Sequence, residues 1–407
     1  MLKRTHLLLS ALIVVSLVLA SCGGAGAGGT VKIVSDLPMT GSSLGQTQTI
    51  VNSINMAFGE TENKACNGAW TIEYEAVDDA SAALGKWDPE VVTANAKRYA
   101  ADASIVGVIG TYNSGAAKLL IPIANPENLV VVSPANTYPG LTRKNGAAEG
   151  EPEVYYPNGQ RNYARIVTPD DVQGAVGAQW AKDLGASSVY ILDDNELYGK
   201  GIADVFDSTA PSLGLNILGH ESIDPKAADY NALATKINEL KPDAVYFGMI
   251  TQNNAGQVIK DLRNAGYEGL LIGPDGIQEV ALIEAAGDAA EGVYSTFAGV
   301  PPNAMTGKAA EWRDAYKAKF GADPEVYAVY GYVTAKLFVD ALNRVCTAGG
   351  SPTDRKAVRD AIFATKDFDS VLGKFSIDPQ GDPTLVAMSG SVVKGGKWEF
   401  VSLLSTK

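Results

Sequence analysis

One short stretch of the sequence could supply a catalytic nucleophile. Residues 41–45, GSSLG, match the G-x-S-x-G pattern of serine hydrolases and follow a predicted strand. Acyl transfer by Ser43 would also need a histidine base, and the chain has only two histidines, His6 and His220. His6 lies in an apolar N-terminal segment, which leaves His220, at the end of a predicted strand. A hydrolase is therefore an alternative that rests on this motif and His220 alone, and we expect a protein that is not an enzyme.

The histidine and cysteine counts also limit metals and cofactors. With three cysteines and two histidines, no Cys/His zinc cluster can be assembled. Gly24, Gly26 and Gly29 have the spacing of a dinucleotide-binding fingerprint, but that motif must follow a strand and open a helix. These glycines precede the first predicted strand, so a flexible tether is the better interpretation. We expect neither a metal site nor a cofactor.

Polar residues gather instead where predicted strands end. Four such segments stand out, at residues 36–41, 111–114, 133–137 and 273–276. In open α/β sheets, ligands bind in the crevice beyond the carboxyl ends of the strands. The elements on either side of these segments predict two such sheets, so the expected site lies between them.

Those elements alternate between short apolar strands and longer helices. In the first half, strands are predicted at 31–37, 70–78, 105–110 and 129–133, with helices at 48–58, 88–100 and 114–124. In the second half, strands are predicted at 187–194, 215–221, 243–249 and 269–275, with helices near 171–184, 198–213, 230–240 and 253–265. Continuous apolar strands separated by helices indicate parallel sheets covered on both faces.

The remaining chain adds helices and a hairpin. Helices are predicted near 308–320, 327–346 and 352–364, and residues 385–404 read as a hairpin that turns at Gly395-Gly396. A chain of 407 residues is longer than one hydrophobic core normally serves. The predicted fold class is α/β, with two doubly wound parallel-sheet units.

The N-terminal segment has the features of an export signal. Lys3 and Arg4 precede an apolar run from Leu7 to Ala20, which is short for a membrane span of roughly 20 residues. Its end, LASC at 19–22, resembles the bacterial lipobox, in which the cysteine receives a lipid and becomes the new N-terminus. We therefore predict a signal peptide at 1–21, lipidation of Cys22 and a flexible tether at 22–30. The alternative is an ordinary signal with an incidental cysteine.

The net charge limits the expected binding partners, and the cysteine count indicates whether a disulfide can form. The formal net charge is −13, and an acidic surface repels phosphate backbones, so nucleic acid is excluded as an expected partner. Beyond Cys22, only Cys66 and Cys346 are left, and an exported protein with two cysteines favours one disulfide. Two separate buried thiols are the alternative.

Five segments together resemble a known family. LPMTG (37–41), VIGTYNSG (108–115), SPANTYPGLT (133–142), TPDDVQG (168–174) and IGPDG (272–276) resemble, in order and spacing, the type I periplasmic-binding-protein fold. More narrowly, they are similar to the leucine/isoleucine/valine-binding proteins of ABC importers. The resemblance implies two lobes joined by three hinge strands near 165–168, 295–301 and 372–378. The implied lobes are 31–166 plus 298–373 and 167–297 plus 374–407, which puts Cys66 and Cys346 in the same lobe.

The resemblance also implies a set of ligand contacts. Matching positions bind the carboxylate of an amino acid through Ser114, a backbone group of Ala135 and Thr137, and its ammonium through Asp275. The residues allow other roles: Ser114 could simply cap the helix that follows, Thr137 could be a turn residue, and Asp275 could form an Asx turn.

The wall around the ligand's side chain is implied by aromatic positions. Tyr198 and Tyr327 match family aromatics, and Tyr112 and Asn113 precede the carboxylate serine; each tyrosine could instead be ordinary packing. Gln46 stands near where branched-chain receptors often have a tyrosine, and MITQNN at 249–254 replaces a segment usually richer in aromatics and glycine. A branched-chain amino acid is thus the first expectation, with an amide or another small polar solute as the alternative.

The implied function is that of an extracytoplasmic solute receptor. The two lobes would close on the amino acid, and a membrane permease of an ABC importer would read the closed form. Lipidation at the lipobox would anchor the receptor to the outer face of the cytoplasmic membrane; otherwise the receptor would be periplasmic. A ligand-sensing receptor of the same fold that signals to a membrane partner is the alternative.

Overall fold

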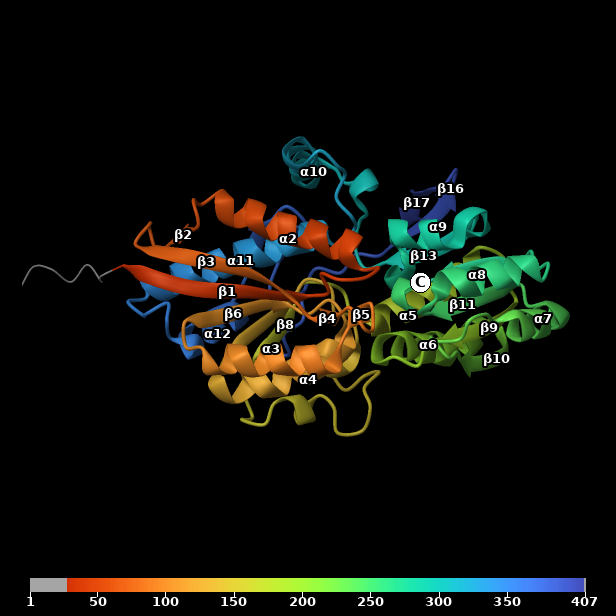
Figure 1. Cartoon of the computed structure of the whole chain (residues 1–407), viewed down its shortest axis with the longest axis horizontal. Coiled ribbons are helices and arrows are strands. Elements are labelled where there is room, and N and C mark those ends of the chain that lie inside the picture. Colours follow the sequence, from red (N-terminus) through yellow and green to blue (C-terminus); the bar gives the residue numbers. More distant parts are fainter. Residues whose placement is uncertain (1–27, 406–407) are drawn as a thin grey trace, which may run out of the picture.

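Two β-sheets lie side by side along the long axis of the molecule (Figure 1). The computed structural model describes residues 28–405, so the predicted signal peptide, the lipidated Cys22 and most of the predicted tether lie outside it. The first sheet has the order β2-β3-β1-β6-β7-β8 and the second β10-β9-β11-β12-β13-β16-β17. Strands in both are parallel except β2, β16 and β17, so the predicted α/β class with two parallel-dominated sheets is confirmed.

The predicted apolar runs correspond closely to β1, β3, β6, β7, β9, β10, β11 and β12, and the predicted hairpin to β16 and β17. The first sheet contains β1 (Gly29–Leu37), β2 (Lys64–Ala65), β3 (Trp70–Asp78), β6 (Ile105–Gly110), β7 (Val130–Ser133) and β8 (Tyr163–Arg165). The second contains β9 (Ser188–Asp193), β10 (Asn216–Ser222), β11 (Ala244–Gly248), β12 (Leu270–Gly273), β13 (Val293–Phe297), β16 (Ser389–Lys394) and β17 (Lys397–Leu403). Two small hairpins pair β4 (Ala80–Ser81) with β5 (Lys86–Trp87), and β14 (Phe368–Ser370) with β15 (Gly373–Phe375).

Helices cover both faces of each sheet. The first is flanked by α2 (Leu44–Gly59), α11 (Ala328–Thr347) and α12 (Arg355–Phe363) on one face and by α3 (Pro89–Ala101) and α4 (Ser114–Ala124) on the other. The second is flanked by α7 (Asn231–Leu240), α8 (Ala255–Asn264) and α9 (Val280–Ala286) on one face and by α5 (Asp170–Asp183) and α6 (Leu197–Thr209) on the other. Helix α10 (Gly307–Phe320) packs near α2 and α11.

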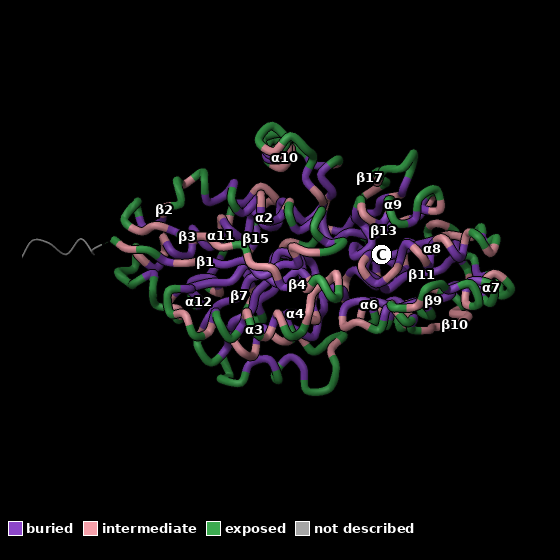
Figure 2. Tube along the Cα trace, viewed as in Figure 1, coloured by how far each residue is buried: buried purple, intermediate pink, exposed green. Residues whose placement is uncertain are grey.

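The strands are apolar on both faces because both faces are buried. In β7, Val130 and Val132 lie on the face covered by α2, α11 and α12, while Val131 lies on the face covered by α3 and α4. This follows from the two-residue alternation of side chains along a strand. Figure 2 shows the buried residues running through the strands and the inner faces of the helices. The continuous apolar strands therefore correctly predicted that both faces of each sheet are buried, since only such a sheet needs apolar side chains on both faces.

Three connections join the sheets. They follow β8, follow β13 and precede β16. The third lies later than the expected 372–378, because the Arg165 amide of β8 still donates to the Gly381 carbonyl oxygen at 2.9 Å. Chain segments up to that point therefore belong beside the first sheet.

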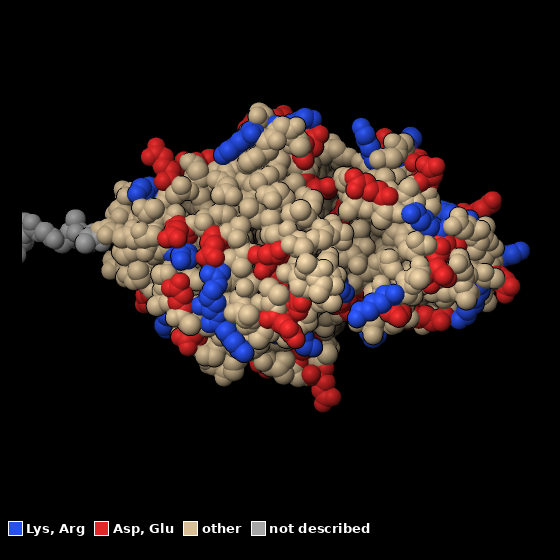
Figure 3. All heavy atoms as spheres, in the orientation of Figure 1, with Lys and Arg blue, Asp and Glu red and all other residues tan. Residues whose placement is uncertain are grey.

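The surface carries both charges mixed together. On the face shown in Figure 3, Lys and Arg side chains are interspersed with Asp and Glu side chains. Among residues 28–405, none of the helices has the length and apolar character needed to cross a membrane.

A disulfide joins two segments that pack beside the first sheet and are far apart in the sequence. Cys66, just after β2, is bonded to Cys346 in the last turn of α11, with a Cα–Cα distance of 5.6 Å. The Cys66 amide also donates to the Asn343 side-chain oxygen at 2.6 Å. The bond closes a loop of 280 residues between the two cysteines. A cross-link over so long a loop removes much entropy from the unfolded chain.

We expect reduction of this disulfide to destabilise the protein. The chain-entropy model gives about 5.6 kcal/mol for a loop of this length. Thermal unfolding of the protein should shift to lower temperature in the presence of a thiol reductant. The Cys66→Ser/Cys346→Ser double variant, the matched control, should melt at the lower temperature with or without reductant. Two titratable thiols in unfolded, unreduced wild-type protein would contradict the bond.

Candidate functional site

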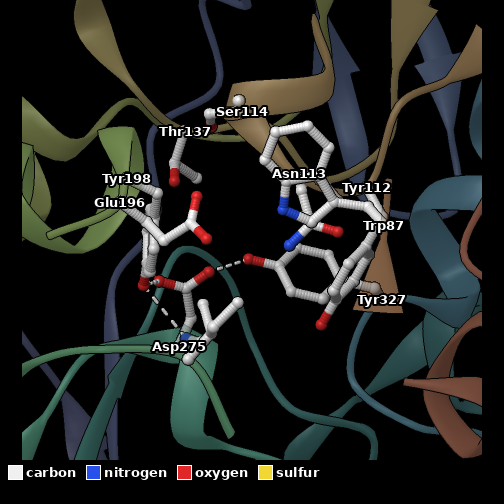
Figure 4. A pocket seen from close by; sticks show the side chains of 13 residues that line it. Trp87, Tyr112, Asn113, Ser114, Thr137, Glu196, Tyr198, Asp275 and Tyr327 are labelled. Atoms are coloured by element: carbon white, nitrogen blue, oxygen red, sulfur yellow. Dashed lines mark hydrogen bonds between the residues drawn. The ribbon is translucent and has the colours of Figure 1, made fainter. Parts of the chain in front are cut away.

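A pocket lies between the two sheets, at the carboxyl ends of their parallel strands (Figure 4). The space between its lining atoms, open mouth included, is about 450 Å³. The structure brings together all eight residues for which the sequence predicted a ligand role: Tyr112, Asn113, Ser114, Ala135, Thr137, Tyr198, Asp275 and Tyr327. Five further residues line the pocket: Trp87, Gly115, Glu196, Ile250 and Gly276.

The buried carboxylate of Asp275 lies at one rim of this pocket. It follows β12 and receives hydrogen bonds from both sides of the pocket. Tyr198 Oη and Gln173 Nε2 each donate to its Oδ1 at 2.7 Å, and Tyr327 Oη donates to its Oδ2. Tyr198 and Gln173 belong to helices of the second sheet, whereas Tyr327 directly precedes α11 of the first. Asp275 therefore links the two sheets.

Burial makes the charged form of the Asp275 carboxylate costly in the absence of a cation. Burial raises the pKa of Asp275, and the hydrogen bonds from Tyr327, Tyr198 and Gln173 act in the opposite direction. No Lys or Arg side chain is among the residues that line the pocket. A buried carboxylate without a cationic partner is costly, so a bound ammonium group would relieve that cost.

Hydrogen-bond donors gather at the opposite rim. Ser114 is the first residue of α4, where the first amide groups of the helix have no partner within the helix. The positive end of the helix dipole adds to this preference for an anion. Thr137, which is 1% exposed, follows β7 and lies beside Ser114 in the pocket wall (Figure 4). This rim can receive a carboxylate.

The hydrogen bonds of two residues at this rim, Ala135 and Asn113, affect what they can offer a ligand. The Ala135 amide donates to Ser133 Oγ at 3.0 Å, so it can serve a ligand only as a shared donor. Asn113, expected as a wall residue, has its side-chain oxygen buried without a hydrogen-bond partner among the described residues. An unsatisfied buried acceptor is costly, so a ligand N–H group directed at Asn113 would stabilise the complex.

The tyrosines are held by residues behind the pocket. Tyr112 Oη donates to Glu279 Oε1 at 2.8 Å and accepts from Gln46 Nε2 at 3.2 Å. Gln252 Nε2 donates to Glu279 Oε2 at 3.0 Å. Gln46 and Gln252, two places where the sequence departs from the branched-chain pattern, therefore support the aromatic wall from behind.

A buried ion pair fixes the loop that carries Ala135 and Thr137. Arg165, fully buried, donates to the carbonyl oxygens of Asn136 at 3.2 Å and Tyr138 at 2.8 Å. Its Nε lies 2.7 Å from Asp382 Oδ1. Burial raises the pKa of Asp382, but the guanidinium groups of Arg165 and Arg143 outweigh this effect and hold the pKa below its usual range. The donor rim thus depends on a contact between residues 217 positions apart in the sequence.

Sequence reasoning missed several lining residues. Trp87 precedes the N-cap Asp88 of α3, and Glu196 precedes Tyr198 by two positions; both follow strands whose carboxyl ends face the pocket. Their position beyond the strand ends could have identified them, because any polar or aromatic residue there is a candidate for contact with a ligand. Nothing in the sequence distinguished Ile250 from an ordinary apolar residue.

The hydrolase alternative has no support from the geometry. Both ring nitrogens of His220, on β10, are taken by carboxylates, Nδ1 by Asp207 at 2.9 Å and Nε2 by Asp193 at 3.2 Å. Ser43 lies at the start of α2, beside the first sheet, whereas β10 is the outer strand of the second sheet. The motif GSSLG is therefore a loop and helix start.

Comparison with known proteins assigns the family. The model of the family described as periplasmic binding protein matches residues 30–397. A Leu/Ile/Val-binding protein homologue of Brucella abortus (strain 2308) is 30% identical over 353 residues, 86% of each chain. An amino acid binding protein of Pseudomonas aeruginosa is 25% identical over 344 residues, 81% of this chain and 84% of that one. The chain belongs to the type I periplasmic binding proteins, in the branched-chain amino acid family, which consists of solute-binding proteins and not enzymes.

Solved structures agree with this fold. The leucine-binding protein LivK of Thermotoga maritima has a TM-score of 0.79 and 25% identity, covering 92% of this chain and 99% of its own. A solute-binding protein of an ABC transporter from R. palustris, solved with benzoate, has a TM-score of 0.75 and 20% identity, covering 92% and 96%. Solved proteins that share the fold of this chain are therefore named for different ligands.

We expect loss of the Asp382 charge to destabilise the fold strongly. Asp382→Ala would leave Arg165 buried without its counter-ion, which costs about 3–5 kcal/mol. The loss should be seen as a lower midpoint in urea unfolding. In the Arg165→Met/Asp382→Leu double variant, the matched control, most of the stability should return because no buried charge is left unpaired. An Asp382→Ala variant as stable as wild type would contradict the role of the pair.

We also expect a pH signature from Glu279, which is 2% exposed. Burial raises its pKa to about 6, against hydrogen bonds from Tyr112 and Gln252. Because this pKa is higher in the folded protein, the contribution to stability is complete below the ordinary pKa and is lost as pH rises through 6.

The test compares the unfolding free energies of wild type and Glu279→Gln across pH. Between pH 4 and 7.5 the difference should move in favour of the variant by about 2 kcal/mol. The exposed Glu239→Gln variant is the control and should show no such trend. A difference independent of pH would show that Glu279 does not titrate in this way.

Proposed function

We propose that this protein is the solute receptor of an ABC importer that binds a free amino acid of the branched-chain type between its two sheets. The observation that carries the proposal is the pair of complementary rims, with Asp275 on one side and Ser114 and Thr137 on the other. An α-amino acid has an ammonium and a carboxylate a short fixed distance apart. Each end would find a partner of opposite character.

The relatives' ligands leave a choice that the rims help to decide. Benzoate carries a carboxylate and no cation, whereas leucine and isoleucine, the ligands named for other neighbours, carry both. The donor rim at the start of α4 would serve either class. Asp275 favours the zwitterion, because a ligand without a cation would leave its buried carboxylate uncompensated.

Closure of the two predicted lobes would link binding to delivery. Tyr327 bonds Asp275 and Tyr112 bonds Glu279, each across the gap between the two sheets. A ligand that contacts both rims has its full affinity only when the sheets approach, so it shifts the population toward the closed form. A membrane permease would then recognise this closed form.

The proposal places the protein outside the cytoplasmic membrane. Membership of the periplasmic-binding-protein family supports an extracytoplasmic location. The LASC motif at 19–22 supports lipidation of Cys22 and anchoring on the outer face of that membrane. In Figure 1, β1 begins at the end of the molecule farthest from the second sheet, so a tether there would leave the pocket accessible.

A ligand screen followed by calorimetry tests the proposal. Thermal-shift measurements with amino acids, small amides and aromatic carboxylates should show the largest stabilisation with leucine, isoleucine or valine. Asp275→Ala should abolish calorimetric binding of that amino acid while the protein stays folded by circular dichroism. Asp229→Ala, which removes an exposed carboxylate of the second sheet's side, is the control and should keep wild-type affinity. Unchanged affinity in Asp275→Ala would remove this carboxylate from the site.

A further inference from the structure

The pocket contains a second carboxylate, that of Glu196, in addition to Asp275. The α-ammonium group of the proposed amino acid is already assigned to Asp275, so Glu196 has no partner in that ligand. Glu196 lines the pocket, and Figure 4 shows its carboxylate directed into the space between Thr137 and Asp275. We propose that Lys86, through its ion pair with Glu196, determines which side-chain charge the pocket accepts. This inference rests on the proposed function, because it concerns the side chain of the amino acid bound there.

Lys86 reaches Glu196 from the other sheet. Its Nζ lies 2.8 Å from Glu196 Oε1 and 2.7 Å from Asn253 Oδ1. Lys86 belongs to β5, which follows β3 of the first sheet, whereas Glu196 and Asn253 follow β9 and β11 of the second. The side chains of Lys86 and Glu196 are 21% and 24% exposed, so the pair is largely withdrawn from solvent. Such a pair is worth more than a fully exposed one.

The short hairpin that carries Lys86 is rigidly attached. Asp78 Oδ1 accepts from the amides of Met39 at 2.7 Å and Ala80 at 2.9 Å. The turn also packs against the loop after β1, since a Cβ on Gly41 would lie 1.8 Å from the carbonyl oxygen of Gly85. Lys86 is therefore presented to the second sheet from a fixed position and is not a freely moving surface lysine.

The neighbouring residue faces the ligand. Successive side chains of a strand point to opposite sides, so Lys86 reaches across the gap while Trp87 forms pocket wall. Trp87 packs over the start of α4, where a Cβ on Gly115 would lie 2.6 Å from its Cζ2. One dipeptide thus supplies both a wall and a charge.

The acceptors of Lys86 are also held in place. The carboxylate of Asp194, which is 1% exposed, accepts from the Glu196 amide at 3.1 Å and from Asn253 Nδ2 at 2.8 Å. The same carboxylate accepts from the Ile250 amide at 3.1 Å, which fixes another wall residue. Glu196 and Asn253 are therefore positioned together as a receptor for the lysine ammonium.

The consequence for specificity follows from the charges around the pocket. Asp275 and Glu196 are the carboxylates among the lining residues, and the lining includes no Lys or Arg. With Asp275 assigned to the α-ammonium, an unpaired Glu196 would attract a second cation, such as the side chain of lysine or ornithine. Lys86 occupies that role, so the pocket favours an amino acid with a neutral side chain.

The experiment measures binding of leucine and lysine by calorimetry in five proteins. These are wild type, Lys86→Met, Lys86→Arg, Lys86→Met/Glu196→Gln and Lys200→Met. Wild type should prefer leucine. In Lys86→Met the ratio of the lysine Kd to the leucine Kd should fall about tenfold, which corresponds to about 1.4 kcal/mol. The double variant should lose that gain, because the freed carboxylate is gone.

Two variants serve as controls. Lys86→Arg retains the positive charge and should keep the preference for leucine. Lys200→Met removes a half-exposed lysine that pairs with Asp204 on α6, away from the pocket lining, and should leave the ratio unchanged. Should Lys86→Met fail to fold, a weakened leucine preference in Glu196→Lys/Lys86→Glu would contradict the inference and a retained one would support it.

The outcomes separate this inference from the proposed function. Absence of amino acid binding to wild type would overturn both. Binding of leucine to wild type together with an unchanged ratio in Lys86→Met would overturn only the role of Lys86. The same lysine gain in Lys86→Met and in the double variant would also overturn it, because Glu196 would then not be the group that is released.

Discussion

The burial of the Asp275 carboxylate between two sheets is the constraint on which the site depends. A carboxylate removed from water must be hydrogen-bonded or paired, and three side chains from two different sheets meet this need. Because Tyr327 comes from the first sheet and Tyr198 from the second, the arrangement is complete only when the sheets are close together. The same requirement makes a small cation a natural partner for the site.

Other polar contacts also cross the gap. Lys86 meets Glu196, and Tyr112 meets Glu279. Most apolar contacts lie within the layers of each sheet and its helices, and Phe297 of β13 packs against Tyr327 beside the second connection. Polar contacts can be exchanged for water at little cost, whereas an apolar interface cannot. These polar contacts fit the proposed opening and closing of the two predicted lobes.

The sequence predicted the fold well because both sheets are covered on both faces. Continuous apolar strands such as residues 105–110 leave little choice of environment, and the helix start at Asp88-Pro89 has a clear capping signal that the structure retains. Of the four strand-end segments that the topology rule indicated, 111–114, 133–137 and 273–276 line the pocket and 36–41 does not. Tyr198 and Tyr327 were predicted only from the family resemblance. The third connection between the sheets was placed too early, since the contact of Gly381 with Arg165 depends on tertiary packing.

By itself, the sequence determined the alternation of strands and helices, the parallel sheets and the ends of strands at which a ligand could bind, because these depend on local periodicity and chain topology. Only the tertiary structure decided which side chains meet across the gap. The pairing of Lys86 with Glu196 and of Arg165 with Asp382 joins residues more than a hundred positions apart. Such pairs leave no local pattern, because their free energy arises only after folding has removed them from water and brought opposite charges together.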